Sequence, residues 1–497
     1  MYVIVIMALS LILAFDGPPL EWVAAPGKVL AVVCAATLLP AGVAWLVGRR
    51  ALRLLERNPA DPGIGQFALN RGMLIVRTVL GLAQVGVLAL TNWLVLCRAV
   101  PIIGQWPLVP GVLAATPLVI AILLVWTAIY PADRAVRAIA LETWLFRSRP
   151  VRPLWPLGRY LLFNLRHQVL FILVPMLLIL AARDLIVHYE TELRAWAGHP
   201  LFPDVLLGTS AGAVALVAPM ILRRVWVTQA LPPGPLRDRL VHLSRKLRMR
   251  CREILVWHTG GMMINAAVMG VLAPFRYFLI TDGMLEQMDD VRVEAVFGHE
   301  AGHVKKHHIL FFLLFAAISG CLVTLAGDYC RGADRKTYEA VVTLTAAGLT
   351  IKWGLLFGWL SRRFERQADI FGVRTLMLAG LPCEGDCPLH DPSDPAQAHA
   401  AQKGDPLCVT AAQVFAQTLQ EVAQLNGIPP RARSWRHGSI ASRVATILRL
   451  AHDPLAVAAF ERGTAWVKLA VLAAVVAVGA VTVWRLRLWT LLPWWPA

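Results

Sequence analysis

The sequence predicts a mainly α-helical, polytopic membrane protein with eight or nine transmembrane helices and a small α+β domain. Hydrophobic residues make up 57% of the 497 residues and charged residues only 16%, which is far from the composition of a soluble domain. The mean hydropathy of +0.60 agrees. The apolar residues form long runs, and the loops between those runs alternate in charge.

Eight apolar runs are long enough to cross a hydrocarbon core of about 30 Å. A ninth run, at 2–15, is short for a crossing and lacks the basic start and cleavage site of a removable signal, so we expect an uncleaved segment there. The eight runs lie near 28–47, 73–96, 108–130, 160–182, 205–222, 309–327, 340–360 and 465–484.

The net charge of +17 comes from arginines that cluster in every second loop. Loops 48–72 and 131–159 and the region after 222 are rich in Arg, whereas loop 183–204 is mostly acidic. Because cytoplasmic loops carry the excess of basic residues, this alternation places 223–308 and 361–463 in the cytoplasm. Charge confined in this way indicates a lipid bilayer as partner and no nucleic acid.

Three parts are expected along the chain. Residues 1–222 form an N-terminal transmembrane region of five or six spans. Residues 223–463 form the functional domain, which includes a transmembrane hairpin at 309–360 and an insertion at 381–410. Residues 464–497 form a C-terminal transmembrane helix with a Trp-rich tail.

The stretch "VFGHEAGHVKKHH" carries the chemistry of this domain. His299 and His303 are four residues apart, so on a helix both imidazoles share one face and can bind one zinc ion. Glu300 lies between them, where a carboxylate can act as general base towards metal-bound water. We expect this helix to begin after the acidic turn at 288–290 and to run on into the span at 309–327. A helix end that is merely rich in histidine is the alternative.

A catalytic zinc site needs a third protein ligand. Glu365 in "SRRFERQADIFG" is the candidate, because two crossings separate it from His303 and return the chain to the same side. Asp369, one turn later, can hydrogen-bond a ligating histidine and fix its tautomer. A solvated helix end, with Glu365 paired to neighbouring arginines, is the alternative.

HEAGH, a two-span excursion and SRRFERQAD together resemble the integral-membrane zinc metallopeptidases that include the type I CAAX prenyl endopeptidase and HtpX. The resemblance covers about 230–450. It implies a zincin-like catalytic domain, one Zn²⁺ per chain, a peptide or membrane-protein substrate, and a multi-pass protein of the bacterial inner membrane whose active site faces the cytoplasm.

The resemblance also implies roles for three further residues. "NAAVMG" corresponds to the family's substrate-binding edge strand, which assigns Asn265 to substrate binding. "SWRHGSIASR" makes His437 a catalytic donor at the scissile carbonyl and Arg443 a supporting partner of the metal ligands. Gly438 stands where the family usually has proline, and a plain helix start is the alternative for His437.

Other readings remain open. A catalytically inactive scaffold or a transporter accounts for the spans but not for the converging ligands. A site-2-type intramembrane protease buries its HExxH motif in lipid and takes an aspartate as third ligand. In the insertion, Cys383, Cys387, His390 and Cys408 could form a Cys₃His metal site, although we expect a loop with reduced thiols instead.

Overall fold

The computed structural model describes residues 25–58, 62–101, 106, 108–146, 149–261, 263–383, 387 and 407–491. The chain divides into two compact units between Val227 and Thr228, a few residues after the expected boundary at 222. The C-terminal helix, expected as a part of its own, belongs to the second unit, where it packs against other helices of that unit.

Eight helices in the described residues are long and apolar enough to cross a membrane. This confirms the prediction of a polytopic, mainly helical protein. The apolar run at 2–15 lies outside the described residues. The eight segments are Pro26–Arg57, Ile64–Leu88, Val109–Ile139, Leu157–His188, Phe202–Val225, His308–Tyr329, Lys336–Ala379 and Pro454–Arg485.

The first unit is built of long helices around a core that contains Ile122 and Trp126. The predicted span at 73–96 is wrong in its bounds. The helix begins earlier and ends at Leu90, because the Thr91 hydroxyl takes over the backbone N–H of Trp93 and a short separate helix follows. The helices are α2 (Pro26–Arg57), α3 (Pro62–Leu90), α4 (Trp93–Arg98), α5 (Val109–Phe146), α6 (Leu157–Asn164), η2 (Leu165–Leu170), α7 (Phe171–His188), α8 (Glu190–Ala197) and α9 (Phe202–Val225).

The second unit contains a four-stranded sheet in the order β1-β2-β4-β3. The central pair β2–β4 is parallel, and the outer pairs β1–β2 and β3–β4 are antiparallel. Strand β4 is buried along its whole length, as expected for the apolar run "YFLIT", and Phe278 packs on Phe297 of the helix above. The strands are β1 (Thr228–Ala230), β2 (Glu253–Trp257), β3 (Ala266–Met269) and β4 (Tyr277–Thr281).

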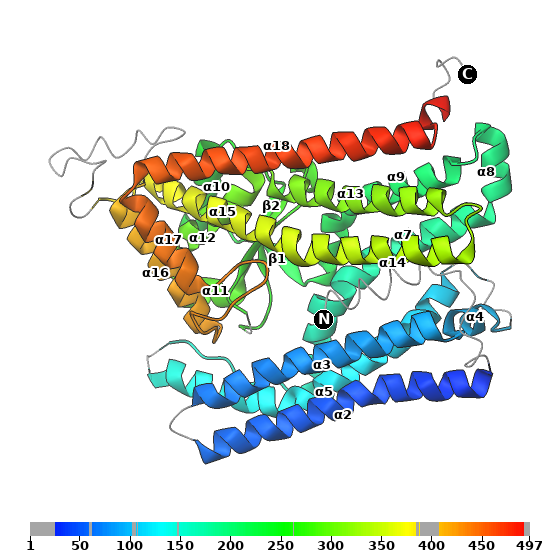
Figure 1. Ribbon diagram of the computed structural model, residues 1–497. Helices are drawn as coiled ribbons and strands as arrows, with labels where there is room; N and C mark the ends of the chain where they lie inside the picture. The colour runs from blue at the N-terminus through cyan, green and yellow to red at the C-terminus, as the bar shows by residue number, and fades with distance from the viewer. Residues whose placement is uncertain are drawn as a thin grey trace. The chain divides into compact units, whose positions relative to one another are not determined.

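Helices surround this sheet and continue into the predicted hairpin. Figure 1 shows α13 and α18 beside the long rod made of α14, η4 and α15. The rod contains a π-helical segment at its middle, where Lys352 donates to the Phe315 carbonyl and the Ser319 hydroxyl. The helices are α10 (Pro235–Lys246), η3 (Ala273–Phe275), α11 (Asp282–Gln287), α12 (Asp290–Lys305), α13 (His308–Tyr329), α14 (Arg335–Ile351), η4 (Lys352–Phe357), α15 (Gly358–Ala379), α16 (Val409–Leu425), α17 (Ile440–Ala451), α18 (Pro454–Arg485) and η6 (Leu488–Leu491).

The helix with the HEAGH motif does not run into the membrane span, contrary to expectation. Helix α12 ends at Lys305, and α13 begins at His308. Between them His307 adopts a left-handed conformation, with φ of 57°. A residue in that region cannot continue a right-handed helix, so the chain breaks its direction directly after the motif.

Candidate metal centre

Helix α12 presents two imidazoles on one face. Its first turn is fixed by Asp289, whose side chain accepts a hydrogen bond from the Arg292 amide at 2.8 Å. His299 and His303 follow at helical spacing, with their Nε2 atoms 3.3 Å apart. The two ring nitrogens therefore face one point in space.

Helix α15 brings a carboxylate to the same point. Oε2 of Glu365 lies 3.6 Å from Nε2 of His299, and Oε1 lies 3.7 Å from Nε2 of His303. The two helices approach closely because glycines face the contact. A Cβ on Gly298 would lie 2.5 Å from Cβ of Thr375, and one on Gly302 would lie 3.0 Å from the Ala368 backbone.

The geometry of these three residues fits a zinc ion. Zn–N bonds of about 2.0–2.1 Å at tetrahedral angles put neighbouring ligand atoms about 3.3–3.4 Å apart. The observed separations of 3.3, 3.6 and 3.7 Å are close to that value. The donor set agrees as well, because two imidazoles and one carboxylate are ligands that zinc accepts.

Asp369 and Arg443 make charged contacts with two of the candidate ligands, His299 and Glu365. Oδ1 of Asp369 lies 2.9 Å from Nδ1 of His299, at ion-pair distance though not aligned as a hydrogen bond. The guanidinium of Arg443 contacts both Asp369 oxygens, at 2.9 and 2.5 Å, and lies 3.5 Å from Glu365. Burial alone would lower the pKa of His299, but Asp369 outweighs it and the pKa is raised. The pKa of Arg443 is raised as well, because its two carboxylates outweigh its burial.

His303 has a supporting partner that sequence reasoning missed. Nδ1 of His308 lies 3.0 Å from Nδ1 of His303, and its Nε2 lies 3.0 Å from Oε1 of Gln367. Lys468 of α18 donates to the same Gln367 oxygen at 2.9 Å. The Gln367 oxygen can only accept, so Nε2 of His308 carries the proton and Nδ1 of the same ring is an acceptor. Nδ1 of His303 therefore donates to it. This leaves the lone pair on Nε2 of His303 available for a metal. Burial lowers the pKa of His303 to about 3, so its ring is neutral.

Glu300 lies between the metal ligands and the sheet. Its Oε2 accepts a hydrogen bond from the backbone N–H of Val268 in β3, at 3.2 Å. Burial raises the pKa of Glu300 to about 7. A carboxyl with a pKa near the working pH is well suited to take up and release a proton.

The edge strand β3 faces this site. Strand β3 pairs only with β4 in the described sheet, and the N–H of Val268 points away from β4 towards Glu300. Asn265 precedes the strand, and its side-chain oxygen accepts from the Ala266 amide on that free edge at 3.0 Å. Sequence reasoning missed Asn426, whose side chain bonds both backbone groups of Ile264 and fixes the start of the strand.

His437 comes from a loop anchored on the rod. Trp435 donates to the Gly354 carbonyl at 2.7 Å, and its own carbonyl accepts from Arg362 at 2.8 Å. This brings Nδ1 of His437 to 2.9 Å from Glu365. The half-exposed ring faces the ligand site. Gly438 has φ of +74°, which proline cannot adopt, so this loop is shaped differently from one with His-Pro.

Comparison with known proteins agrees with this arrangement. Residues 239–401 match the profile of Peptidase family M48. This range contains His299, His303 and Glu365. This part of the chain is therefore similar to peptidase family M48. The resemblance that the sequence motifs indicated is thereby confirmed.

The chain is similar to several curated relatives over part of its length. It is 30% identical over 105 residues to a "Protease HtpX homolog" of Methanopyrus kandleri, covering 21% of this chain and 32% of that protein. It is 28% identical over 145 residues to "Protease HtpX" of Xylella fastidiosa, covering 26% and 50%. The chain thus spans half or less of the length of these relatives.

A solved structure with low similarity is S. mikatae Ste24p. The likeness has a TM-score of 0.47 at 12% identity and covers 87% of this chain and 100% of that one.

Proposed function

We propose that this protein is a membrane-embedded zinc endopeptidase that hydrolyses peptide bonds at the cytoplasmic face. The convergence of His299, His303 and Glu365 on one point, with Glu300 beside them, is the observation that supports it most. These three residues would hold one Zn²⁺ per chain. Zinc, when bound, supplies a Lewis acid that polarises a carbonyl and lowers the pKa of water to about 7.

The free edge of β3 suits an extended peptide. A substrate segment can add to this edge as a further strand, with backbone hydrogen bonds to Val268 and the residues beside it. Asn265 would then exchange its bond to the Ala266 amide for one to the peptide. This pairing would bring the scissile carbonyl next to Glu300, which already contacts the same edge.

Glu300 and His437 would carry the proton transfers and the charge. Glu300, as carboxylate, accepts a proton from the attacking water and passes it to the nitrogen of the leaving amine. His437 donates a hydrogen bond to the carbonyl oxygen as negative charge develops on it. Its position 2.9 Å from Glu365 and its partial exposure support this role, because the ring borders both the ligand set and solvent.

Loop charge supports the cytoplasmic face. The arginine-rich segments at 48–72, 131–159 and after 222 lie at every second loop. Both parts of the candidate site, 223–308 and 361–463, fall on that side. Such a site in a bacterial inner membrane would act on a peptide or on a membrane protein with an exposed cytoplasmic segment.

Substituting the general base tests this function. The Glu300→Gln variant removes the proton acceptor and leaves His299, His303 and Glu365 in place. We expect it to keep its zinc and to lose about 10²- to 10⁴-fold in kcat/KM on a quenched-fluorescent unstructured peptide. Fragments of membrane proteins that appear with the wild type and not with the variant would then identify substrates by proteomics.

Glu286→Gln provides a matched control, because Glu286 is an exposed glutamate on α11 outside the site. This variant should retain wild-type rates. Equal hydrolysis by wild type and Glu300→Gln, or purified wild-type protein without bound zinc, would exclude the proposed function.

A further inference from the structure

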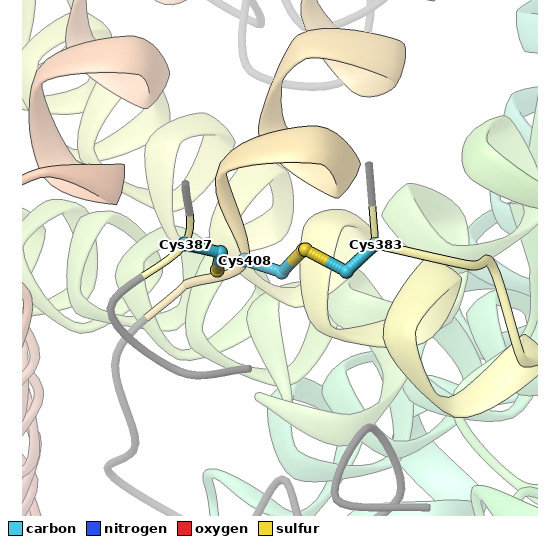
Figure 2. Close-up of side chains that lie close together, drawn as sticks. All are labelled: Cys383, Cys387 and Cys408. Atoms are coloured by element: carbon cyan, nitrogen blue, oxygen red, sulfur yellow. The ribbon is translucent and has the colours of Figure 1, made fainter. Parts of the chain in front are cut away.

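A second group of potential metal ligands lies at the insertion, apart from the candidate metal centre. The sulfur atoms of Cys383, Cys387 and Cys408 all lie within 4.8 Å of one another. Figure 2 shows the three side chains close together although they come from separate points of the chain. Cys383 follows the end of α15, and Cys408 is the N-cap residue directly before α16.

We propose that these three thiols bind a soft divalent cation such as Zn²⁺ at a structural site. The three cysteines would supply three of four tetrahedral positions as thiolates. On binding, each S–H bond breaks, the sulfur forms a bond to the metal, and the proton passes to solvent, so no oxidant or reductant is required. The remaining position is open to water or another donor. His390 lies outside the described residues and is not part of the proposal.

The sulfur spacing suits a metal better than a disulfide. Zn–S bonds of about 2.3 Å at tetrahedral angles place two sulfurs about 3.8 Å apart. The observed distance from Cys383 to Cys408 is 3.6 Å. A disulfide requires about 2.05 Å, and thiols facing the cytoplasm stay reduced. Cys383 and Cys408 are free thiols and form no disulfide with each other.

Cys408 lies in the protein core. The residue is 2% exposed and packs in the core formed by α12, α15, α16, α17 and α18. A metal bound to its sulfur would therefore be shielded from solvent on that side.

Such a site would fasten both ends of the insertion. Cys383 and Cys408 are 25 residues apart in sequence and close the segment between α15 and α16. Helix α16 packs on both α15 and α12, which carry the candidate zinc ligands. A metal bridge here would hold α16 against these helices. The proposal does not depend on peptidase activity.

Metal content and spectroscopy of the full-length protein in detergent test the proposal. Wild type should bind about two zinc ions per chain, and Cys383→Ser/Cys408→Ser should bind about one. The His299→Ala/His303→Ala variant should also bind about one. After reconstitution with Co²⁺ in a reducing buffer, this histidine variant should keep the sulfur-to-cobalt charge-transfer absorption. The cysteine variant should lack that absorption.

Cys330→Ser serves as the control, because Cys330 lies at the end of α13 outside the group. It should leave both the stoichiometry and the cobalt spectrum unchanged. If the double cysteine variant does not fold, titration of the histidine variant with a mercurial reagent replaces it, and about one zinc per chain should be released. Absence of thiolate–cobalt absorption in wild type, or a Cys383–Cys408 disulfide in protein prepared under reducing conditions, would overturn the proposal. Neither result bears on the histidine site.

Discussion

The raised pKa of the Glu300 carboxyl predicts how the activity depends on pH. Its pKa is raised to about 7 by burial, and a cation beside it can only lower that value. The carboxylate is the form that accepts a proton, so we expect kcat/KM to fall as pH decreases through an apparent pKa at or below 7. A pH–rate profile measures this acid limb. A limb centred well above pH 7 would show that another group controls the rate.

His308 gives a second prediction at single-residue resolution. It fixes the tautomer of His303 through the 3.0 Å contact between their Nδ1 atoms. Substitutions of such supporting partners commonly reduce metal affinity by about 10- to 100-fold. We therefore expect His308→Ala to weaken zinc binding by that factor, measured by competition with a chelator of known affinity.

The neighbouring histidine offers the control. His307 is exposed and has φ of 57°, a conformation that asparagine tolerates well. His307→Asn should keep the affinity of the wild type. Equal zinc affinity in His308→Ala and wild type would remove His308 from the support of the site.

Candidate ligands were predictable because their chemistry leaves a local pattern. His299 and His303 have helical spacing, and the number of crossings places Glu365 on their side of the membrane. His308, Gln367 and Asn426 leave no such pattern. They act through contacts between residues 5, 59 and 162 positions apart. The pair "HH" at 307–308 was the only sign of a further histidine near the site. It does not show which of the two contacts His303.

The contact between α12 and α15 determines whether Glu365 reaches the histidines. Gly298 lies where a methyl group would come within 2.5 Å of Cβ of Thr375. We expect Gly298→Ala to push the helices apart, to destabilise the protein by about 1–3 kcal/mol and to weaken zinc binding. Thermal unfolding and chelator competition measure the two effects.

Gly320→Ala is the comparison for this prediction. Gly320 lies on α13, and nothing lies within 4 Å of a Cβ built there. This variant should unfold like wild type and keep its zinc. Full zinc affinity in Gly298→Ala would mean that the helices can adjust without moving the ligands.

Helices were predictable where apolar runs are long, but their ends were not. Hydropathy found α13 and its neighbours, yet the run through "HVKKHH" gave no sign of the break at His307. No glycine or proline marks this position, where His307 adopts a left-handed conformation. Similarly, the polar Thr91 ends α3 inside an apolar run because its hydroxyl competes for a backbone amide.

The orientation of the whole chain remains a prediction that labelling can test. Arg331 follows the first crossing of the hairpin and should face the side opposite Arg250, which lies in the cytoplasmic segment. Both residues are exposed. In intact spheroplasts, Arg331→Cys should gain labelling by an impermeant maleimide over wild type. Arg250→Cys should gain it only after permeabilisation. The reverse pattern would place the site outside.

At the level of the molecule, composition and apolar runs were enough to predict a polytopic protein, and the family resemblance added the small sheet domain. The end of an apolar run placed a boundary at 222, a few residues before the division between Val227 and Thr228. The sequence also did not show that α18 belongs to the second unit, because the composition of an apolar helix does not predict which helices it packs against. Lys468 reveals this through its bond to Gln367.

The candidate ligand atoms come from both ends of a hairpin whose helices are long enough to span a bilayer, since α12 precedes the hairpin and α15 completes it. No water-soluble fragment of this chain can therefore contain the intact centre. Cutting the chain within the hairpin would separate the two imidazoles from the carboxylate. A soluble version of the proposed site would therefore need a different third ligand.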